Sequence, residues 1–181
     1  YEHAHDFCDI LIVGAGPAGI AAAKEAANKK LDVILVEQDS LLGGDQLGEN
    51  NFNTNQIYDE LKSLGIRIMQ RTTAFGLYDN CVLGLLERVT DHVPYGNIDL
   101  PRQRFWTIRA KHVVIGAGSL ERHIAYNNND IPGVMTVNAS KHYLNRYGIL
   151  TGQNIVITTN NDSVYPTADL LSSAGANITV L

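Results

Sequence analysis

Apolar residues near the start of the chain form two short continuous runs, at residues 10–13 and 33–36, with an alanine-rich segment between them. The segment from about Pro17 to Lys29 places small and apolar side chains at helical spacing. Short apolar runs without alternating polar residues are typical of strands that are buried on both faces of a parallel sheet. The pattern therefore predicts a strand, a helix and a second strand in one βαβ unit.

The pattern changes in the middle of the chain. Helical spacing predicts a helix over residues 55–64, ended by Gly65, and an apolar run then predicts a strand over 66–70. Shorter alternating segments predict an antiparallel β-meander, at residues 74–78, 81–89 and 104–110, with Asp79-Asn80 as a hairpin turn and a polar loop at 93–103. Residues 113–115 form a further buried strand. The pattern thus predicts an α/β protein with a meander inserted at about residues 72–110.

The last third of the chain repeats the first pattern. A polar stretch with Pro132 and Gly133 interrupts the regular spacing at residues 127–133 and predicts a connection between domains. We then expect a helix from a cap at Asn138 to Tyr147, ended by Gly148. A strand, a helix and a strand follow at residues 154–157, 163–174 and 177–181.

Composition narrows the class of protein. The chain has 181 residues, 45% hydrophobic and 18% charged, as expected for one or two globular domains. Its apolar runs are far shorter than the ~20 residues of a membrane span, and no signal segment precedes them, so we expect a cytoplasmic protein. A net charge of −5 without a large basic cluster argues against nucleic acid and membranes as partners.

The histidines and cysteines predict no special chemistry. Residues 1–9 are polar and are expected to form a solvated tail, in which His3 and His5 lack the third ligand and the rigid frame of a metal site. Cys8 and Cys81 are spaced neither for a metal nor for a redox pair. The chain opens without Met and stops on what looks like a newly begun strand, so we expect a fragment of a longer protein.

The boundary between the first strand and the first helix carries a glycine motif. Gly14 permits a tight turn, Gly16 lets a pyrophosphate approach the backbone, and Gly19 lets the helix pack closely on the strand. The helix begins near Pro17 and Ala18, where its free N–H groups and dipole favour an anion. The spacing predicts a dinucleotide site.

A carboxylate and a second glycine pair follow at matching positions. Glu37 ends the second strand about 20 residues past the glycines, where a carboxylate holds the ribose hydroxyls. Beyond Glu37 and Gln38, Gly43-Gly44 and Gln46 are interpreted as a return of the chain over the cofactor, although an ordinary loop would have the same sequence. We therefore expect a Rossmann-like FAD/NAD(P)-binding fold, with a dinucleotide-binding domain over residues 1–126 and the start of a second, truncated βαβ domain over 127–181.

Two later turns differ from this motif. In Gly116-Ala117-Gly118, the position of the third glycine holds Glu121, so Ala117 and Gly118 either approach the cofactor or simply end a strand. In the second βαβ unit, Thr158, Asn160 and Ser163 stand where the first has its glycines. We expect no second dinucleotide there.

Several segments together resemble the alpha subunits of heterotetrameric sarcosine oxidases. The glycine motifs fit any member of the pyridine-nucleotide–disulfide reductase superfamily, whereas two pieces are narrower: Leu-Asn-Arg-Tyr-Gly at 144–148 and Thr-Asn-Asn-Asp-Ser at 159–163. The His-Ala-His-Asp-Phe-Cys-Asp lead-in at 3–9 and the segment 116–122 add to the likeness. The resemblance implies bound NAD, other oxidase subunits as partners, and a complex that demethylates sarcosine to glycine and forms hydrogen peroxide.

The residues themselves leave alternatives open. NAD and FAD share the groups that the glycines and Glu37 would bind, so only the resemblance favours NAD over FAD, while the charge of Glu37 disfavours NADP. The chain could instead be the FAD-binding half of a free-standing NAD(P)H-dependent reductase, although it lacks a redox cysteine pair. NAD could also be a purely structural ligand. We assign no catalytic residue.

Overall fold

The computed structural model describes residues 1–49, 51–94 and 99–181, so part of the loop expected at 93–103 lies outside the described residues. The chain forms two compact units, Tyr1–Gly118 and Ser119–Leu181. Residues 119–126, which we assigned to the first domain, belong to the second unit. No helix in the described part of the chain is long and apolar enough to cross a membrane.

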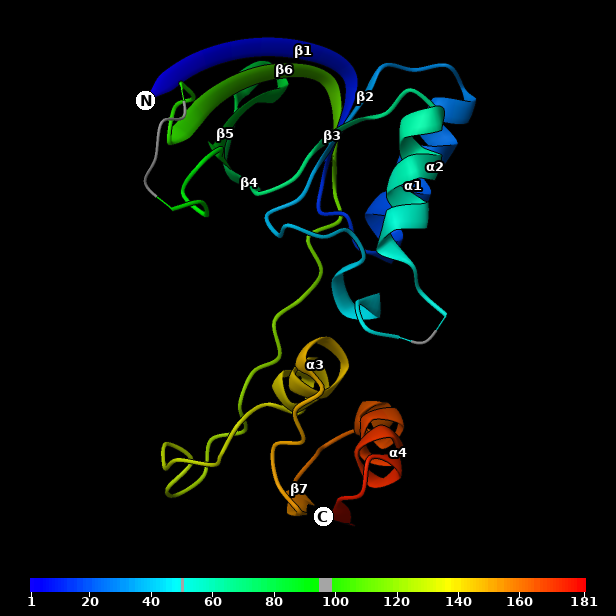
Figure 1. Ribbon diagram of the computed structural model, residues 1–181, viewed down its shortest axis with the longest axis vertical. Helices are drawn as coiled ribbons and strands as arrows, with labels where there is room; N and C mark the ends of the chain where they lie inside the picture. The colour runs from blue at the N-terminus through cyan, green and yellow to red at the C-terminus, as the bar shows by residue number, and fades with distance from the viewer. Residues whose placement is uncertain (50, 95–98) are drawn as a thin grey trace. The chain divides into compact units, whose positions relative to one another are not determined.

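The first unit is built on one mixed sheet (Figure 1). Its strands have the order β3-β2-β1-β6-β5-β4. Parallel pairing joins β1, β2, β3 and β6, and antiparallel pairing joins β6, β5 and β4. The strand bounds are β1 Glu2–Val13, β2 Val33–Val36, β3 Arg67–Met69, β4 Thr72–Tyr78, β5 Val82–Arg88 and β6 Gln103–Ile115. The expected α/β fold with an inserted meander is confirmed.

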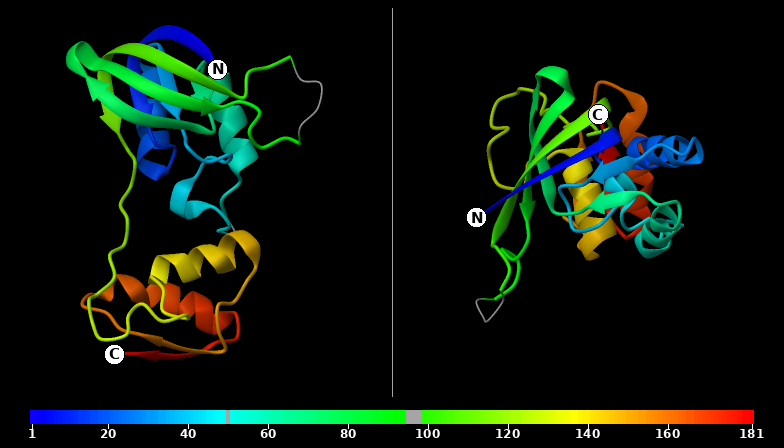
Figure 2. Two further views of the ribbon diagram at one scale, coloured as in Figure 1. Left: turned by 90° about the vertical axis from the view of Figure 1, so that its left-hand side faces the viewer. Right: turned by 90° about the horizontal axis from the view of Figure 1, so that it is seen from above.

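Two apolar layers cover the parallel strands of this sheet, one beneath the helices and one beneath the meander. Helices α1 (Pro17–Asn28) and α2 (Thr54–Ser63) lie side by side and bury Ile20 and Leu61 against Ile12 and Leu35 of the parallel strands. On the opposite face, Leu11 and Ile34 pack with Leu83, Leu85 and Ile108 of the meander, where the same sheet curves round (Figure 2). Because successive side chains of a strand point to opposite faces, each short apolar run supplies both layers. The continuous runs noted in the sequence are therefore explained.

The prediction of a solvated tail is wrong. Residues 2–9 belong to β1, which pairs in parallel with β6 from Glu2 onward. The polar side chains of this segment have partners, because Glu2 pairs with Arg104 at 2.6 Å and Asp6 with Arg67 at 2.5 Å. The meander segment 104–110 and the strand 113–115 are likewise one continuous strand, β6. Backbone pairing with β6 on one edge extends the polar start of β1 as a strand, whereas β6 itself is paired on both edges, with β1 and β5.

The second unit contains the strand, helix and strand that were expected after residue 153. Strands β7 (Asn154–Ile157) and β8 (Asn177–Val180) are parallel, with α4 (Tyr165–Ser173) between them in sequence. Helix α3 (Val137–Tyr147) ends at Gly148, whose φ is 66°, as expected. Its N-cap is Thr136 rather than Asn138, because the Thr136 hydroxyl accepts from the Ala139 N–H at 3.4 Å. The Asn138 N–H instead donates to the Glu121 carboxylate at 2.7 Å.

Candidate functional site

The turn between β1 and α1 depends on two glycines. Gly14 has a φ of +96°, and its N–H donates to the Val36 carbonyl at 2.8 Å, which ties the turn to the end of β2. A Cβ at Gly19 would collide with the Gly14 carbonyl oxygen. The turn and the close helix packing are thus present for the steric reasons that the spacing indicated. Ligand binding by these residues stays a prediction.

Gly16 differs from Gly14 and Gly19 because a side chain there would point into open space. It is the N-cap of α1 with a φ of −77°, and a Cβ there would have no neighbour within 4 Å among the described residues. Pro17 begins the helix, and Pro17 and Ala18 are both exposed. Within the described part of the chain, no side chain caps this helix. The first-turn N–H groups therefore face a space that an anion could enter.

Glu37 lies directly beside this turn. Its side chain is 9% exposed, one carboxylate oxygen accepts from the Ala15 N–H at 2.7 Å, and the other accepts from the Asp39 N–H at 2.9 Å. The backbone of Glu37 is bonded on both sides, to the Met69 carbonyl and the Thr72 N–H, each at 2.8 Å. Each oxygen keeps a second lone pair for another donor. The carboxylate is therefore fixed in place and still able to accept from hydroxyl groups.

The second glycine pair packs against the first turn. The Gly43 N–H donates to the Ala15 carbonyl at 2.8 Å, and a Cβ at Gly44 would lie 3.2 Å from the Cα of Gly16. Both glycines have positive φ, +132° and +55°. They lead into the short 3-10 helix η1 (Gly44–Gln46), whose last N–H donates back to the Gly43 carbonyl. Gln46 is thus placed next to the glycine pair.

The end of β6 reaches the same turn. The Gly116 N–H donates to the Val13 carbonyl at 2.7 Å, and a Cβ on Gly14 would meet the Gly116 carbonyl and the Cα of Ala117. Gly118 has a φ of +71°, and a Cβ there would meet none of these residues within 4 Å. The structure therefore brings Ala117 to the glycine turn and leaves Gly118 at its margin.

Three further residues support the site without having been predicted. Ala15 links Glu37 to Gly43 through its backbone N–H and carbonyl, and Gly116 closes the turn. The Arg88 guanidinium donates to the carbonyl of Gln38, whose side chain is exposed. Ala15 acts only through its main chain, so its side chain carried no signal. The run of small residues at 116–118 is the one sequence signal that could have pointed to Gly116.

The loop after β7 lacks this geometry. No residue from 158 to 163 has a positive φ. The Asn161 side chain instead accepts from the Ser163 N–H at 3.0 Å and caps the short 3-10 helix η3 (Asp162–Val164). A cavity of about 530 Å³ borders this loop and runs along β7. In the described residues β7 pairs only with β8, so this hollow lies beside an open sheet edge.

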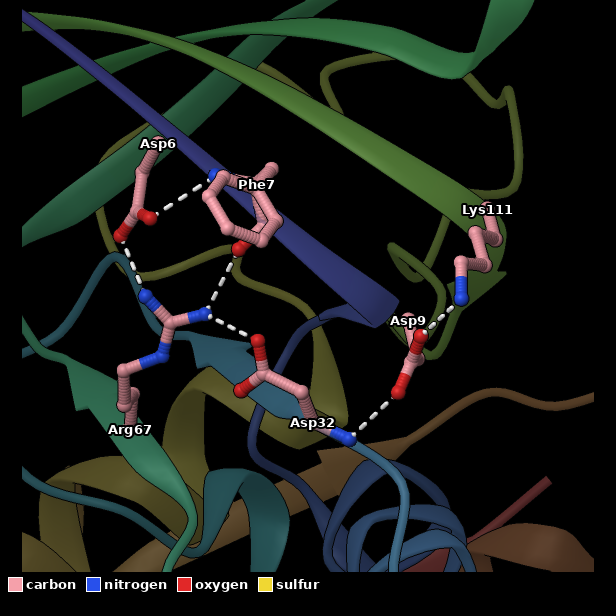
Figure 3. A network of polar contacts seen from close by, with 6 residues as sticks. All are labelled: Asp6, Phe7, Asp9, Asp32, Arg67 and Lys111. Carbon is pink, nitrogen blue, oxygen red and sulfur yellow. Dashed lines mark hydrogen bonds and ion pairs between the residues drawn. The ribbon is translucent and has the colours of Figure 1, made fainter.

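A polar network lies at the other end of the parallel strands (Figure 3). Arg67 binds Asp6, Asp32 and the Phe7 carbonyl, at 2.5, 2.8 and 2.7 Å. Partial burial lowers the pKa of Arg67, but the hydrogen bonds and charges of the two aspartates outweigh it and raise the pKa. Nearby, a hydrogen bond from Lys111 lowers the pKa of Asp9. This network ties β1 to β3 and to the residue before β2.

Cys8 lies on β1 between Phe7 and Asp9 of this network, and burial raises the pKa of its thiol to about 11.

The described residues contain no group of three or more histidine, cysteine, aspartate or glutamate side chains that could hold a metal. The glycine turn with Glu37 is therefore the candidate site.

Comparisons with known proteins agree with this geometry. The chain matches the family model of the pyridine nucleotide-disulphide oxidoreductases over residues 8–158. It is 39% identical to sarcosine oxidase subunit alpha of Rhizobium meliloti (strain 1021) and 38% identical to that of Corynebacterium sp. (strain U-96). Both alignments cover 100% of this chain, and 19% and 20% of the relatives. The chain thus spans about a fifth of their length.

A solved structure, L-proline dehydrogenase from P. horikoshii, has the same fold. Its TM-score is 0.75 with 24% sequence identity, and the match covers 100% of this chain and 36% of that chain. The predicted resemblance to sarcosine oxidase alpha subunits is confirmed by the sequence comparisons. The chain belongs to the pyridine nucleotide-disulphide oxidoreductase family.

Proposed function

We propose that this chain is the dinucleotide-binding part of the alpha subunit of a sarcosine oxidase and that its ligand is NAD. One observation carries the proposal. The Glu37 carboxylate is held by the Ala15 N–H inside the glycine turn, so a ribose acceptor and an anion-binding helix start belong to one hydrogen-bonded unit. Identity of 39% to named alpha subunits supports the assignment to this enzyme.

The residues present fit an adenine dinucleotide. Gly16 leaves space beside the N-terminus of α1, where the pyrophosphate would accept from the Ala18 and Gly19 N–H groups. Glu37 would accept from the ribose hydroxyls, and its charge would repel the 2′-phosphate of NADP. Gly43, Gly44, Gln46 and Ala117 would border the pyrophosphate. Once bound, NAD would supply a nicotinamide ring that can accept a hydride.

The reaction belongs to the complete assembly. In the proposed oxidase, sarcosine, oxygen and water give glycine, formaldehyde and hydrogen peroxide, with tetrahydrofolate as an alternative acceptor of the one-carbon unit. Other subunits are the proposed partners and hold the flavin that oxidises sarcosine. We expect this chain alone to form no peroxide from sarcosine, which a peroxidase-coupled assay would check. Peroxide formation without a partner would contradict the proposed division of labour.

The identity of the ligand is the decisive test. We expect denatured, purified protein to release one NAD per chain, identified by mass spectrometry. Release of one FAD per chain would contradict NAD and favour the free-standing reductase, for which the same glycines and Glu37 would serve. If NAD is released but is never reduced when the assembled enzyme turns over sarcosine, its role is structural.

A further inference from the structure

One face of the first unit carries an unusual set of side chains. On β1, β6, β5 and β4 the side chains alternate between the buried meander core and solvent. The solvent side presents aromatic rings and an arginine. We call it the aromatic face, formed by His3, Phe7, Phe75, Tyr78, Phe105 and Arg109.

The rings of this face are in contact across the sheet. The centroid of Phe105 on β6 lies 5.5 Å from that of His3 on β1 and 5.0 Å from that of Phe75 on β4. The Phe75 ring covers Gly84 so closely that a Cβ there would collide with it, and the Tyr78 ring covers Gly76 in the same way. Two glycines thus let rings lie close to the backbone. The result is a continuous row of rings that reaches from β1 across β6 to β4.

These rings are exposed although they are apolar. Phe7, Phe75 and Phe105 are 74%, 48% and 37% exposed, whereas Leu85 and Ile108 on the other side of the same sheet are fully buried. Half-buried sheets normally place polar residues outward. A contiguous exposed apolar patch on a globular protein marks an interaction site. The aromatic face therefore has the character of a surface that something covers.

The charges on this face indicate what covers it. Phe7 lies opposite Arg109 in the β1–β6 register, and Arg109 makes no ion pair with any described residue. The next outward carboxylate, Asp9, is already paired with Lys111 at 2.7 Å. Among its described residues the face thus carries one unpaired cation, Arg109, although the chain has a net charge of −5. It complements an acidic surface.

The same charges disfavour two other occupants. A second copy docked on this face through a two-fold axis beside Arg109 would bring the two Arg109 side chains together, and like charges oppose such an interface. Nucleic acid binding depends on several phosphate contacts by lysine and arginine, and this face offers a single unpaired arginine in the described residues.

We propose that the aromatic face docks a different polypeptide with an apolar centre and an acidic rim, namely another subunit of the oxidase. This rests on the proposed function for the identity of the partner. The Phe75–Phe105 row forms the centre of the interface, since large buried rings dominate binding energy, and Arg109 fixes its orientation.

A site-specific crosslink tests this directly. The subunit is produced in its native host together with its companion subunits, with the photoreactive residue p-benzoylphenylalanine in place of Phe75. Irradiation should attach it to another subunit, identified by peptide mass spectrometry. Leu77 is the matched control, because it is 54% exposed on the same strand but is displaced to the other face. The same substitution there should give no crosslink to that subunit.

Any other attachment overturns the proposal. The proposal would be refuted by a crosslink from position 75 to a second copy of this chain or to another part of its own polypeptide. The absence of any crosslink would refute it as well. Charge reversal provides a second measurement. Arg109→Glu should weaken the complex at least about tenfold by sedimentation at low salt, whereas Arg102→Glu, which reverses another exposed arginine, should change it less than about twofold.

The outcome is separable from that of the proposed function. Ligand content is measured by mass spectrometry in every preparation. Full NAD content with no crosslink to another subunit would refute the docking and leave the dinucleotide proposal intact. A crosslink to another subunit in protein that contains no NAD would support the docking and refute the NAD proposal.

Discussion

Replacing Glu37 by alanine separates the two roles of this carboxylate. Both of its oxygens accept from backbone N–H groups, and the Ala15 N–H lies in a fully buried residue. Leaving that group unpaired costs about 1–3 kcal/mol of folding stability. Loss of the charge-assisted bond to ribose should weaken NAD binding by about 1.5–3 kcal/mol, or roughly ten- to hundredfold.

The two effects need two measurements. Thermal unfolding without ligand reports the buried N–H, and calorimetric titration of NAD below the unfolding temperature reports the ribose contact. Glu37→Gln adds a test of charge, because an amide oxygen can satisfy only one of the two N–H groups while its NH₂ faces the other. We expect it to lose both stability and affinity. An amide that behaved like the wild type would mean that charge and paired acceptors are unimportant here.

The control is an exposed glutamate. Glu25 on α1 pairs with Lys29 at 3.1 Å, and both side chains are about two-thirds exposed. Such a pair contributes about 0.5 kcal/mol or less, so Glu25→Ala should leave both measurements nearly unchanged. If Glu37→Ala folded normally and bound NAD and FAD as tightly as the wild type, the assignment of the ribose contact would be refuted.

Three further predictions follow from particular backbone and burial features. Gly16→Ala should leave thermal unfolding unchanged and lower NAD affinity at least about tenfold. Gly19→Ala should destabilise the fold by about 1–3 kcal/mol, because of these two positions only Gly19 would bring the methyl group against the backbone. Equal unfolding temperatures of the two variants would contradict this. Burial raises the pKa of Cys8 from 9.0 to about 11, so the unfolded chain releases this proton first, and stability should fall between these pH values by at most about 3 kcal/mol. Denaturant titrations of the wild type and Cys8→Ala would check this, and an identical fall in the variant would exclude Cys8 as the cause. Titration with NAD should saturate at one equivalent per chain; a second equivalent that disappears in Asn160→Ala would show that the second unit binds as well.

Local sequence predicted those elements whose signal lies within one segment. Strand β7 was expected at residues 154–157 and is found there, because its apolar run is continuous and flanked by turn residues. The first half of β1 was missed because its stability comes from residues about a hundred positions later. Arg104 on β6 pairs with Glu2, and the backbone of β6 supplies the partner groups of the strand. A polar segment becomes a strand when a distant partner satisfies it, and a local window cannot detect that.

The candidate site shows the same division. The glycines and Glu37 could be recognised because the site needs their side chains, or the lack of one, at fixed spacing. Ala15 could not, because it contributes an N–H and a carbonyl that every residue except proline possesses. The role of Arg88 could not be predicted for another reason. Its contact with the Gln38 carbonyl depends on β5 and the end of β2 meeting in space.

The two units share a βαβ arrangement but differ at the turn where a dinucleotide would bind. β1 with α1 and β2 has the same order as β7 with α4 and β8, and both strand pairs are parallel. The difference lies in the turn, where Thr158, Asn160 and Ser163 of the second unit stand at the positions of the three glycines of the first. In the first unit Gly14 turns with positive φ, and the helix start is left to main-chain N–H groups. In the second, the Asn161 side chain already accepts from the Ser163 N–H at the start of η3. A carboxamide oxygen therefore takes one of the donors that a phosphate would need, so the fold sets the position of a site and the turn decides its chemistry.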